Sequence, residues 1–153
     1  FRVELTQDGQ TVVGCSSEYR PRRAGGGHAG HGAPALAVAA PALPWTLAAA
    51  TGRRYARVSG DWNPIHLAAI LARPFGFRGA IAHGMYCVGR AAAAIEGLAG
   101  SPVTAIDARF RRPVPLPGTV AFACAGAAAG AGAYSIGSAD GAAVYVTGSW
   151  QAG

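Results

Sequence analysis

Alternating apolar and polar positions at the start of the chain predict a β-hairpin. The apolar members of the first run are Phe1, Val3 and Leu5. Asp8-Gly9 is a two-residue turn signal, and the β-rich run at residues 11–13 follows it. Side chains two positions apart share one face of a strand, and Asp-Gly favours tight hairpin turns. A lone hairpin is not stable in water, so we expect residues 1–22 to pack on something else.

A nearly continuous apolar run at residues 84–98 predicts a buried helix. Its charged residues are Arg90 and Glu96. A surface helix has one apolar stripe, whereas a helix that is apolar nearly all round must be surrounded by other elements. We therefore expect this helix at the centre of a domain.

Short β-like runs follow the helix and predict a sheet. The predicted strands cover residues 105–111, 118–125, 133–137 and 142–150, with turn signals at 115–118 and 139–141. The small-residue run 125–133 has neither a helical nor a strand period, and its conformation stays open. A sheet curled around one helix is the simplest solution, which makes the expected class α+β.

Residues 23–44 are rich in Gly, Ala, Pro and His and have no period, which predicts a linker. We expect three parts: the hairpin at 1–22, this linker, and a main domain at 45–153.

Composition narrows the function classes. The chain has 153 residues, 51% of them hydrophobic and 13% charged, as in a compact domain. Its net charge of +6 rests on arginine, because lysine is absent. The arginine clusters are not interleaved with aromatic residues, so we do not expect nucleic acid as a partner. A solvated basic surface is the simplest explanation of these clusters.

The sequence also bears on location. No uncharged apolar run approaches the length of about 18 residues that a membrane span needs. Nothing at the start of the chain has the pattern of a secretory signal. Cys15, Cys87 and Cys124 are far apart and form no CxxC pair, which favours reduced thiols and a cytoplasmic location.

The segment around Asp61 and His66 carries the strongest chemical signal. A carboxylate and an imidazole lie within six residues of sequence, among the turn formers Gly60, Asn63 and Pro64. We expect residues 55–58 to be strand-like and the turn formers to bend the chain after them, so that both side chains face one space. Such a pair suits general acid/base chemistry.

A second signal lies at the start of the predicted central helix. His83 directly precedes the helix, where capping and packing are common roles. Gly84 opens the helix and offers its backbone amide, which could bind an oxyanion at the positive end of the helix dipole.

Other site chemistries find little support. The carboxylates after residue 50 are too far apart in sequence for an obvious glycosidase pair. His28 and His31 lie in a glycine-rich segment without nearby metal ligands. Ser59 is not in a GxSxG elbow, and Cys87 falls inside the predicted buried helix.

Three runs together resemble the MaoC-like acyl dehydratases, the (R)-specific enoyl-CoA hydratase (hydratase 2) family of the hot-dog fold. They are SGDWNPIH at 59–66, GFRGAIAHGM at 76–85 and ARFRRPVPLPGTV at 108–120. The resemblance covers roughly residues 45–150. It implies a curved antiparallel sheet wrapped around a central helix.

The resemblance also implies an activity: reversible hydration of trans-2-enoyl thioesters to (R)-3-hydroxyacyl thioesters. Asp61 and His66 would be catalytic, and the Gly84 amide would bind the oxyanion. Substrate-binding roles would fall to Asn63, His83 and Met85. The family needs no metal or redox cofactor, and coenzyme A or an acyl-carrier phosphopantetheine enters as part of the substrate.

The resemblance further implies partners. A second hot-dog domain would be either another copy or a tandem repeat, and the hairpin at 1–22 would be the tail of a preceding repeat. Arginines could contact the phosphates of coenzyme A or an acidic acyl carrier protein. Three alternatives stay open: a domain that binds acyl thioesters without hydrating them, a hot-dog thioesterase, and a structural half without catalysis.

Overall fold

The computed structural model describes residues 2–7, 10–16 and 42–153, and it divides into two compact units at residues 1–32 and 33–153. The first unit holds the antiparallel strands β1 (Arg2–Gln7) and β2 (Gln10–Ser16), with Arg2 opposite Ser16. They fall where the alternation predicts a hairpin. Its origin as the tail of a preceding repeat stays a prediction, and most of the predicted linker lies outside the described residues.

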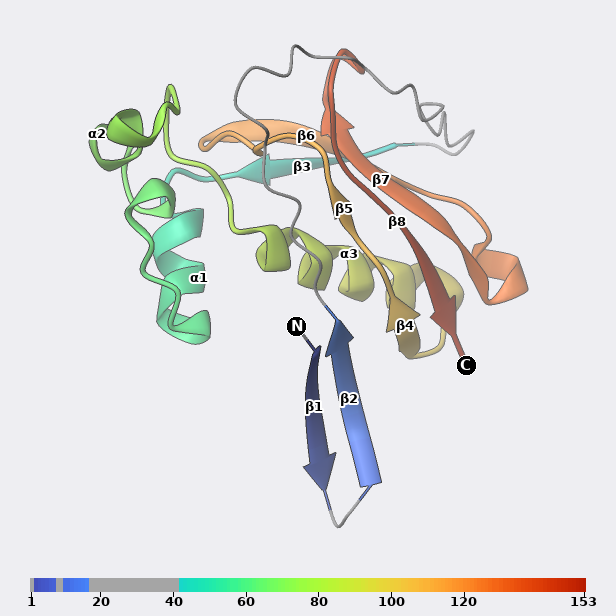
Figure 1. Ribbon diagram of the computed structural model, residues 1–153. Coiled ribbons are helices and arrows are strands. Elements are labelled where there is room, and N and C mark those ends of the chain that lie inside the picture. Colours follow the sequence, from blue (N-terminus) through green and yellow to red (C-terminus); the bar gives the residue numbers. More distant parts are fainter. Residues whose placement is uncertain (1, 8–9, 17–41) are drawn as a thin grey trace, which may run out of the picture. The chain divides into compact units, whose positions relative to one another are not determined.

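An antiparallel sheet of six strands forms the framework of the second unit. Its order is β3-β6-β7-β8-β4, and β5 also pairs with β8. The strands are β3 (Leu43–Leu47), β4 (Val103–Ile106), β5 (Arg109–Phe110), β6 (Gly118–Cys124), β7 (Ala131–Ser138) and β8 (Val144–Ala152). The helix α3 (Gly84–Ala99) runs along one side of this curved sheet, as Figure 1 shows. The predicted arrangement of a curved sheet and one central helix is confirmed.

The core lies between α3 and the concave side of the sheet. The helix contributes Cys87, Ala91 and Ile95 to it. From the strands come large side chains with almost no exposure, and these are Leu47, Val120, Phe122, Tyr134, Ile136, Val146 and Trp150. Along β6 and β7 every second side chain in the middle of the strand is buried, so the buried side chains of these two strands lie on one face of the sheet.

The helix α3 is less enclosed than the sequence predicts. Its exposed positions include Met85, Gly89, Ala93 and Gly97, which recur every fourth residue and therefore lie along one side. A single sheet can cover only the opposite side. Small residues on the uncovered side make the run apolar in sequence without requiring burial there.

The segment before the site is a helix, which corrects the expected strand-like run at residues 55–58. Helix α1 (Thr51–Ser59) buries one side and exposes its arginines. It ends at Gly60, whose left-handed φ of 74° lets its amide donate to the Ala56 carbonyl. Packing of the buried side explains the helix despite the β-like composition of this run.

Other boundaries also differ from those predicted. Strand β3 begins at Leu43, inside the predicted linker, and the predicted strand at 105–111 divides into β4 and β5 around Asp107. The short helical elements are η1 (Pro64–His66), α2 (Ala69–Ala72), η2 (Arg73–Phe75) and η3 (Ala127–Ala129). The last of these lies in the small-residue run left open above, between the left-handed residues Gly126 and Gly130. Among the described residues, no helix combines the length and hydropathy that a membrane crossing needs.

Candidate active site

The loop after α1 is folded by its own polar side chains. Ser59 Oγ donates to the Tyr55 carbonyl at 3.0 Å and accepts from the Asp61 amide at 3.2 Å. Asp61 Oδ1 then accepts from the Asn63 amide at 3.1 Å. Together with the left-handed Gly60, these bonds reverse the chain direction and fix the Asp61 carboxyl group.

Asn63 and Pro64 start the next element and set the direction of His66. Asn63 Oδ1 accepts from the Ile65 amide at 3.3 Å, which caps η1, and Pro64 occupies the first position of that turn. The Asn63 carbonyl accepts from the His66 amide at 3.0 Å. Asn63 thus holds the turn, and its predicted contact with substrate stays a prediction.

His66 is buried, at 8% exposure, and its ring is oriented by the backbone. Nδ1 lies 2.8 Å from the Ile81 carbonyl. Since a carbonyl only accepts, Nδ1 carries the hydrogen, and Nε2 of the neutral ring presents its lone pair. This Nε2 lies 4.0 Å from Asp61 Oδ2.

The surroundings of His66 favour its neutral form. Burial lowers the pKa of His66 below its ordinary value of 6.5, and the hydrogen bond to Ile81 opposes this shift. The nearby His83 also lowers the pKa, and the Asp61 carboxylate raises it. At neutral pH the ring is therefore ready to accept a proton.

A close approach of α1 supports the backbone at His66. A Cβ atom at Gly52 would lie 1.9 Å from the His66 carbonyl oxygen, so any side chain there forces the two segments apart. Arg53 adds a hydrogen bond of 2.7 Å from its guanidinium to the Leu67 carbonyl. Sequence reasoning missed Gly52, and a glycine in the first turn of a helix is the signal that could have drawn attention to it.

His83 joins the start of α3 to the loop that holds Asp61. Its Nε2 donates to the Asp61 backbone carbonyl at 2.9 Å, and its ring stacks on His66 with centroids 3.7 Å apart. The Tyr55 ring packs at 5.0 Å from the His83 ring. His83 is 3% exposed and its predicted contact with substrate stays a prediction.

The contact of His83 brings the start of α3 beside the Asp61–His66 pair. The amides of a first helical turn have no acceptor within the helix, so the Gly84 and Met85 amides can donate to a group outside α3. A Cβ atom at Gly84 would lie 2.7 Å from the ring of Phe110, so a side chain there would displace this exposed ring. Met85 is 55% exposed, as a side chain at the mouth of a site would be.

The same donor atoms fit a metal ion poorly. One ligand atom from each of Asp61, His66 and His83 lies within 4.8 Å of the others. The two rings are stacked at 26°, so their nitrogen lone pairs run side by side instead of converging. His83 Nε2 also carries the hydrogen that it donates to Asp61. A thiol nucleophile is disfavoured too, since burial raises the pKa of Cys87 to about 11.

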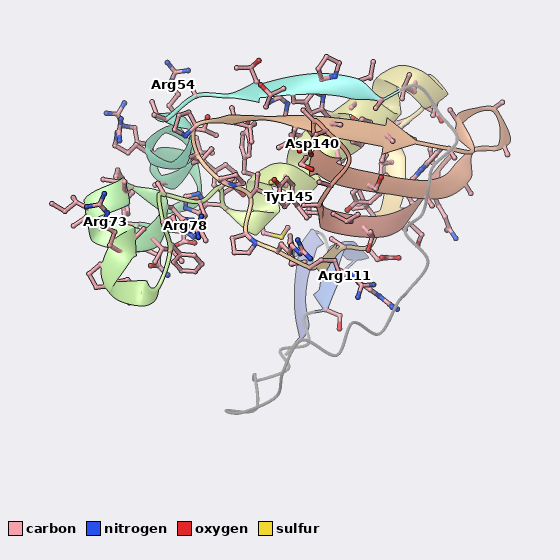
Figure 2. All side chains as sticks on the ribbon, turned by 90° about the horizontal axis from the view of Figure 1, so that it is seen from above. Arg54, Arg73, Arg78, Arg111, Asp140 and Tyr145 are labelled. Atoms are coloured by element: carbon pink, nitrogen blue, oxygen red, sulfur yellow. The ribbon has the colours of Figure 1, made fainter. Side chains whose placement is uncertain are left out.

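Exposed basic side chains lie on several elements of this unit. Figure 2 shows Arg54, Arg73 and Arg78 projecting from α1, η2 and the loop that follows η2, whereas Arg111 projects from the strand side. The loop with Asp61 leaves the C-terminal end of α1.

Comparison with known proteins identifies the family. The model of the MaoC like domain matches residues 36–133, which include the paired Asp61 and His66 and the start of α3. The chain belongs to the MaoC-like dehydratase family. A curated relative, 3-hydroxyacyl-thioester dehydratase X of Mycobacterium tuberculosis, is 44% identical over 79 residues, or 52% of this chain and 28% of that protein.

Solved structures agree with this membership and with the hot-dog fold. HtdX of Mycobacterium tuberculosis is 34% identical with a TM-score of 0.64, covering 74% of this chain and 48% of that one. An R-hydratase from Pseudomonas aeruginosa is 27% identical with a TM-score of 0.59, covering 72% of this chain and 76% of that one. This MaoC-like chain thus spans half or less of the length of its Mycobacterium relatives.

Proposed function

We propose that this MaoC-like domain catalyses the reversible hydration of trans-2-enoyl thioesters to (R)-3-hydroxyacyl thioesters. The paired Asp61 carboxylate and His66 imidazole carry the proposal. We infer a hydratase/dehydratase activity because the chain is similar to a 3-hydroxyacyl-thioester dehydratase, and we infer the (R) configuration because it is similar to an R-hydratase. Asp61 and His66 supply the acid/base chemistry.

The geometry of the pair suits the binding of one water. Asp61 Oδ2 accepts no hydrogen bond from the described residues, and His66 Nε2 faces it at 4.0 Å. A water oxygen about 2.8 Å from each atom fits this gap, because ordinary hydrogen-bond lengths meet there without crowding. The Asp61 side chain is 53% exposed, so substrate can reach such a water.

In the hydration direction, His66 Nε2 takes one proton from the water as its oxygen bonds to C3. Asp61 accepts a hydrogen bond from the other hydrogen of the water and orients it. The C2–C3 π electrons move toward the thioester carbonyl, whose oxygen becomes an enolate. The His66 imidazolium then gives its proton to C2, and the carbonyl re-forms. The net change is addition of H and OH, and dehydration is the reverse.

The start of α3 would stabilise the enolate. The Gly84 amide meets the thioester oxygen, where an oriented donor is typically worth about 2.7 to 4 kcal/mol in the transition state. The positive end of the 16-residue helix adds to this effect. Met85 and Asn63 line the approach of the acyl group.

The carrier would be coenzyme A or the phosphopantetheine of an acyl carrier protein. Exposed arginines of this unit, such as Arg54 and Arg78, suit the phosphates of either carrier. A second hot-dog domain would cover the open side of α3, and the active form would exceed one domain. Light scattering that shows an active single-domain monomer would contradict this assembly. The predicted cytoplasmic location stays part of the proposal.

A direct assay tests the proposed activity. Crotonyl-coenzyme A is incubated with the protein, and the loss of enoyl absorbance and the release of free thiol are followed together. Hydration removes the enoyl absorbance with the thioester intact. Thiol release without prior loss of the enoyl group would support a thioesterase instead, and no change in either signal would support a binding or structural domain.

A further inference from the structure

The ring of His83 contacts both halves of the acid/base pair. Its Nε2 donates to the backbone carbonyl of Asp61 at 2.9 Å, and its face stacks on the His66 ring at 3.7 Å. These contacts span 22 positions of sequence between His83 and Asp61. One side chain thus connects the loop after α1, the turn η1 and the start of α3.

The donor of His83 fixes a loop that has few other restraints. Asp61 is otherwise held within its own loop, where its amide donates to Ser59 Oγ and its Oδ1 accepts from the Asn63 amide. Local bonds of this kind set the shape of a loop but not its position relative to other elements. The bond from His83 ties the loop to α3, and a shift of about 1 Å in a catalytic group can cost about 10²-fold in rate.

The burial of His83 separates this role from contact with substrate. The residue is 3% exposed, and its Nδ1 is buried without a hydrogen-bond partner among the residues that the structure describes. An unpaired buried acceptor lowers the stability of the folded state, so the ring is held there against a penalty. An apolar side chain would fill the same space without burying an unpaired nitrogen. Packing alone therefore does not explain a histidine at this position.

We propose that His83 is a positioning residue, whose Nε2–H group fixes the Asp61 loop and whose ring holds the His66 imidazole toward the Asp61 carboxylate. This role rests on the proposed function of the pair. It takes the place of the predicted contact between His83 and substrate.

Two variants of His83 separate the donor from the ring. His83→Phe keeps a stacked ring and removes the donor, and His83→Gln keeps an amide donor and removes the ring. We expect His83→Phe to lower kcat about 10²-fold with KM little changed, because the substrate contacts remain. We expect His83→Gln to recover part of that loss by donating to the Asp61 carbonyl.

Tyr134→Phe provides a matched control. The Tyr134 hydroxyl donates to the backbone carbonyl of Asp107 at 2.9 Å, from a fully buried ring on β7. Its loss removes a hydrogen bond of the same kind and length, so melting temperatures of the two Phe variants should fall by similar amounts. We expect Tyr134→Phe to keep the kcat of the parent.

A second readout does not depend on turnover. The groups that face His66 are the Asp61 carboxylate, the His83 ring and the Ile81 carbonyl, and His83 acts to lower the pKa of His66. Titration of the imidazole protons by NMR should therefore show the His66 pKa rising in His83→Phe. If the parent is inactive but this shift appears, the proposed function fails and the coupling of the two rings stands.

Three results would overturn the positioning role. The first is a raised KM with unchanged kcat in His83→Phe, which would indicate contact with substrate. The second is an equal loss of kcat in Tyr134→Phe, which would indicate a general loss of stability. The third is an unchanged His66 titration in both His83 variants.

Discussion

Two aspartates of this domain have the same backbone restraint and different side-chain surroundings. A buried ring donates to the backbone carbonyl of each at 2.9 Å: His83 to Asp61, and Tyr134 to Asp107. The Asp107 carboxylate accepts from the Ser149 hydroxyl. Asp61 Oδ2 instead faces the Nε2 atoms of His66 and His83 at 4.0 and 3.8 Å, and the gap to His66 fits a water. The comparison teaches that the proposed role of Asp61 depends on one oxygen, Oδ2, which accepts no hydrogen bond from the described residues, although Oδ1 accepts from Asn63.

The first way to test this comparison is to remove the charge of each aspartate. We expect Asp61→Asn to lower kcat/KM by about 10²- to 10⁴-fold, because an acid/base group is lost from the water site. Asp107→Asn keeps an oxygen that can accept from Ser149, and we expect parent-like activity. Steady-state kinetics with crotonyl-coenzyme A checks both variants, with circular dichroism as the control for folding. Equal losses at both positions would mean that Asp61 has no special role.

The second test concerns the oxyanion donor at the start of α3. We expect Gly84→Pro to lower kcat by about 10²- to 10³-fold and to change KM little, because the lost amide acts on developing charge. Proline is tolerated at the first position of a helix, and His83 already has the extended ψ of 137° that proline requires of its predecessor.

A side chain at position 84 also meets the Phe110 ring, so the control must allow for that contact. The substitution is therefore made together with Phe110→Ala, and Gly84→Ala/Phe110→Ala keeps the amide in the same background. Equal kcat in the two double variants would move the oxyanion role to another group.

The smallest expected effect is the pH dependence of stability that arises from His66. Its pKa in the folded state lies below 6.5, so the unfolded chain binds this proton more readily. The contribution of His66 to stability is complete above about pH 6.5 and falls as the pH drops toward the lowered pKa. Urea unfolding of the parent and of His66→Gln between pH 5 and 7.5 should show a shallower decline in the variant. Parallel curves would contradict burial of a neutral ring.

The sequence predicted the parts of the site that depend on nearby residues. Asp61 and His66 lie within one turn-rich segment, where Gly60 and Asn63 act through bonds to their immediate neighbours. The start of α3 was also predicted, from the glycine at position 84 that opens the apolar run. These features follow from backbone geometry that a residue type imposes locally.

Contacts between distant segments were not predictable in this way. The β-like residues 55–58 form a helix because α1 packs closely on His66, a contact that depends on Gly52. The bond from His83 to Asp61 joins residues 22 positions apart. The open side of α3 depends on how many other elements pack against the helix. The apolar composition of the helix does not give that number.

The most direct test of the central claim is the fate of the water oxygen. Crotonyl-coenzyme A is turned over in water enriched in the heavy oxygen isotope, and the products are analysed by mass spectrometry and chiral chromatography. If Asp61 and His66 activate water for addition to C3, the label appears in the hydroxyl group of an intact (R)-3-hydroxybutyryl thioester, and Asp61→Asn and His66→Ala form almost none. Label in a free carboxylate, or undiminished labelling of the hydroxyl group in either variant, would contradict the account.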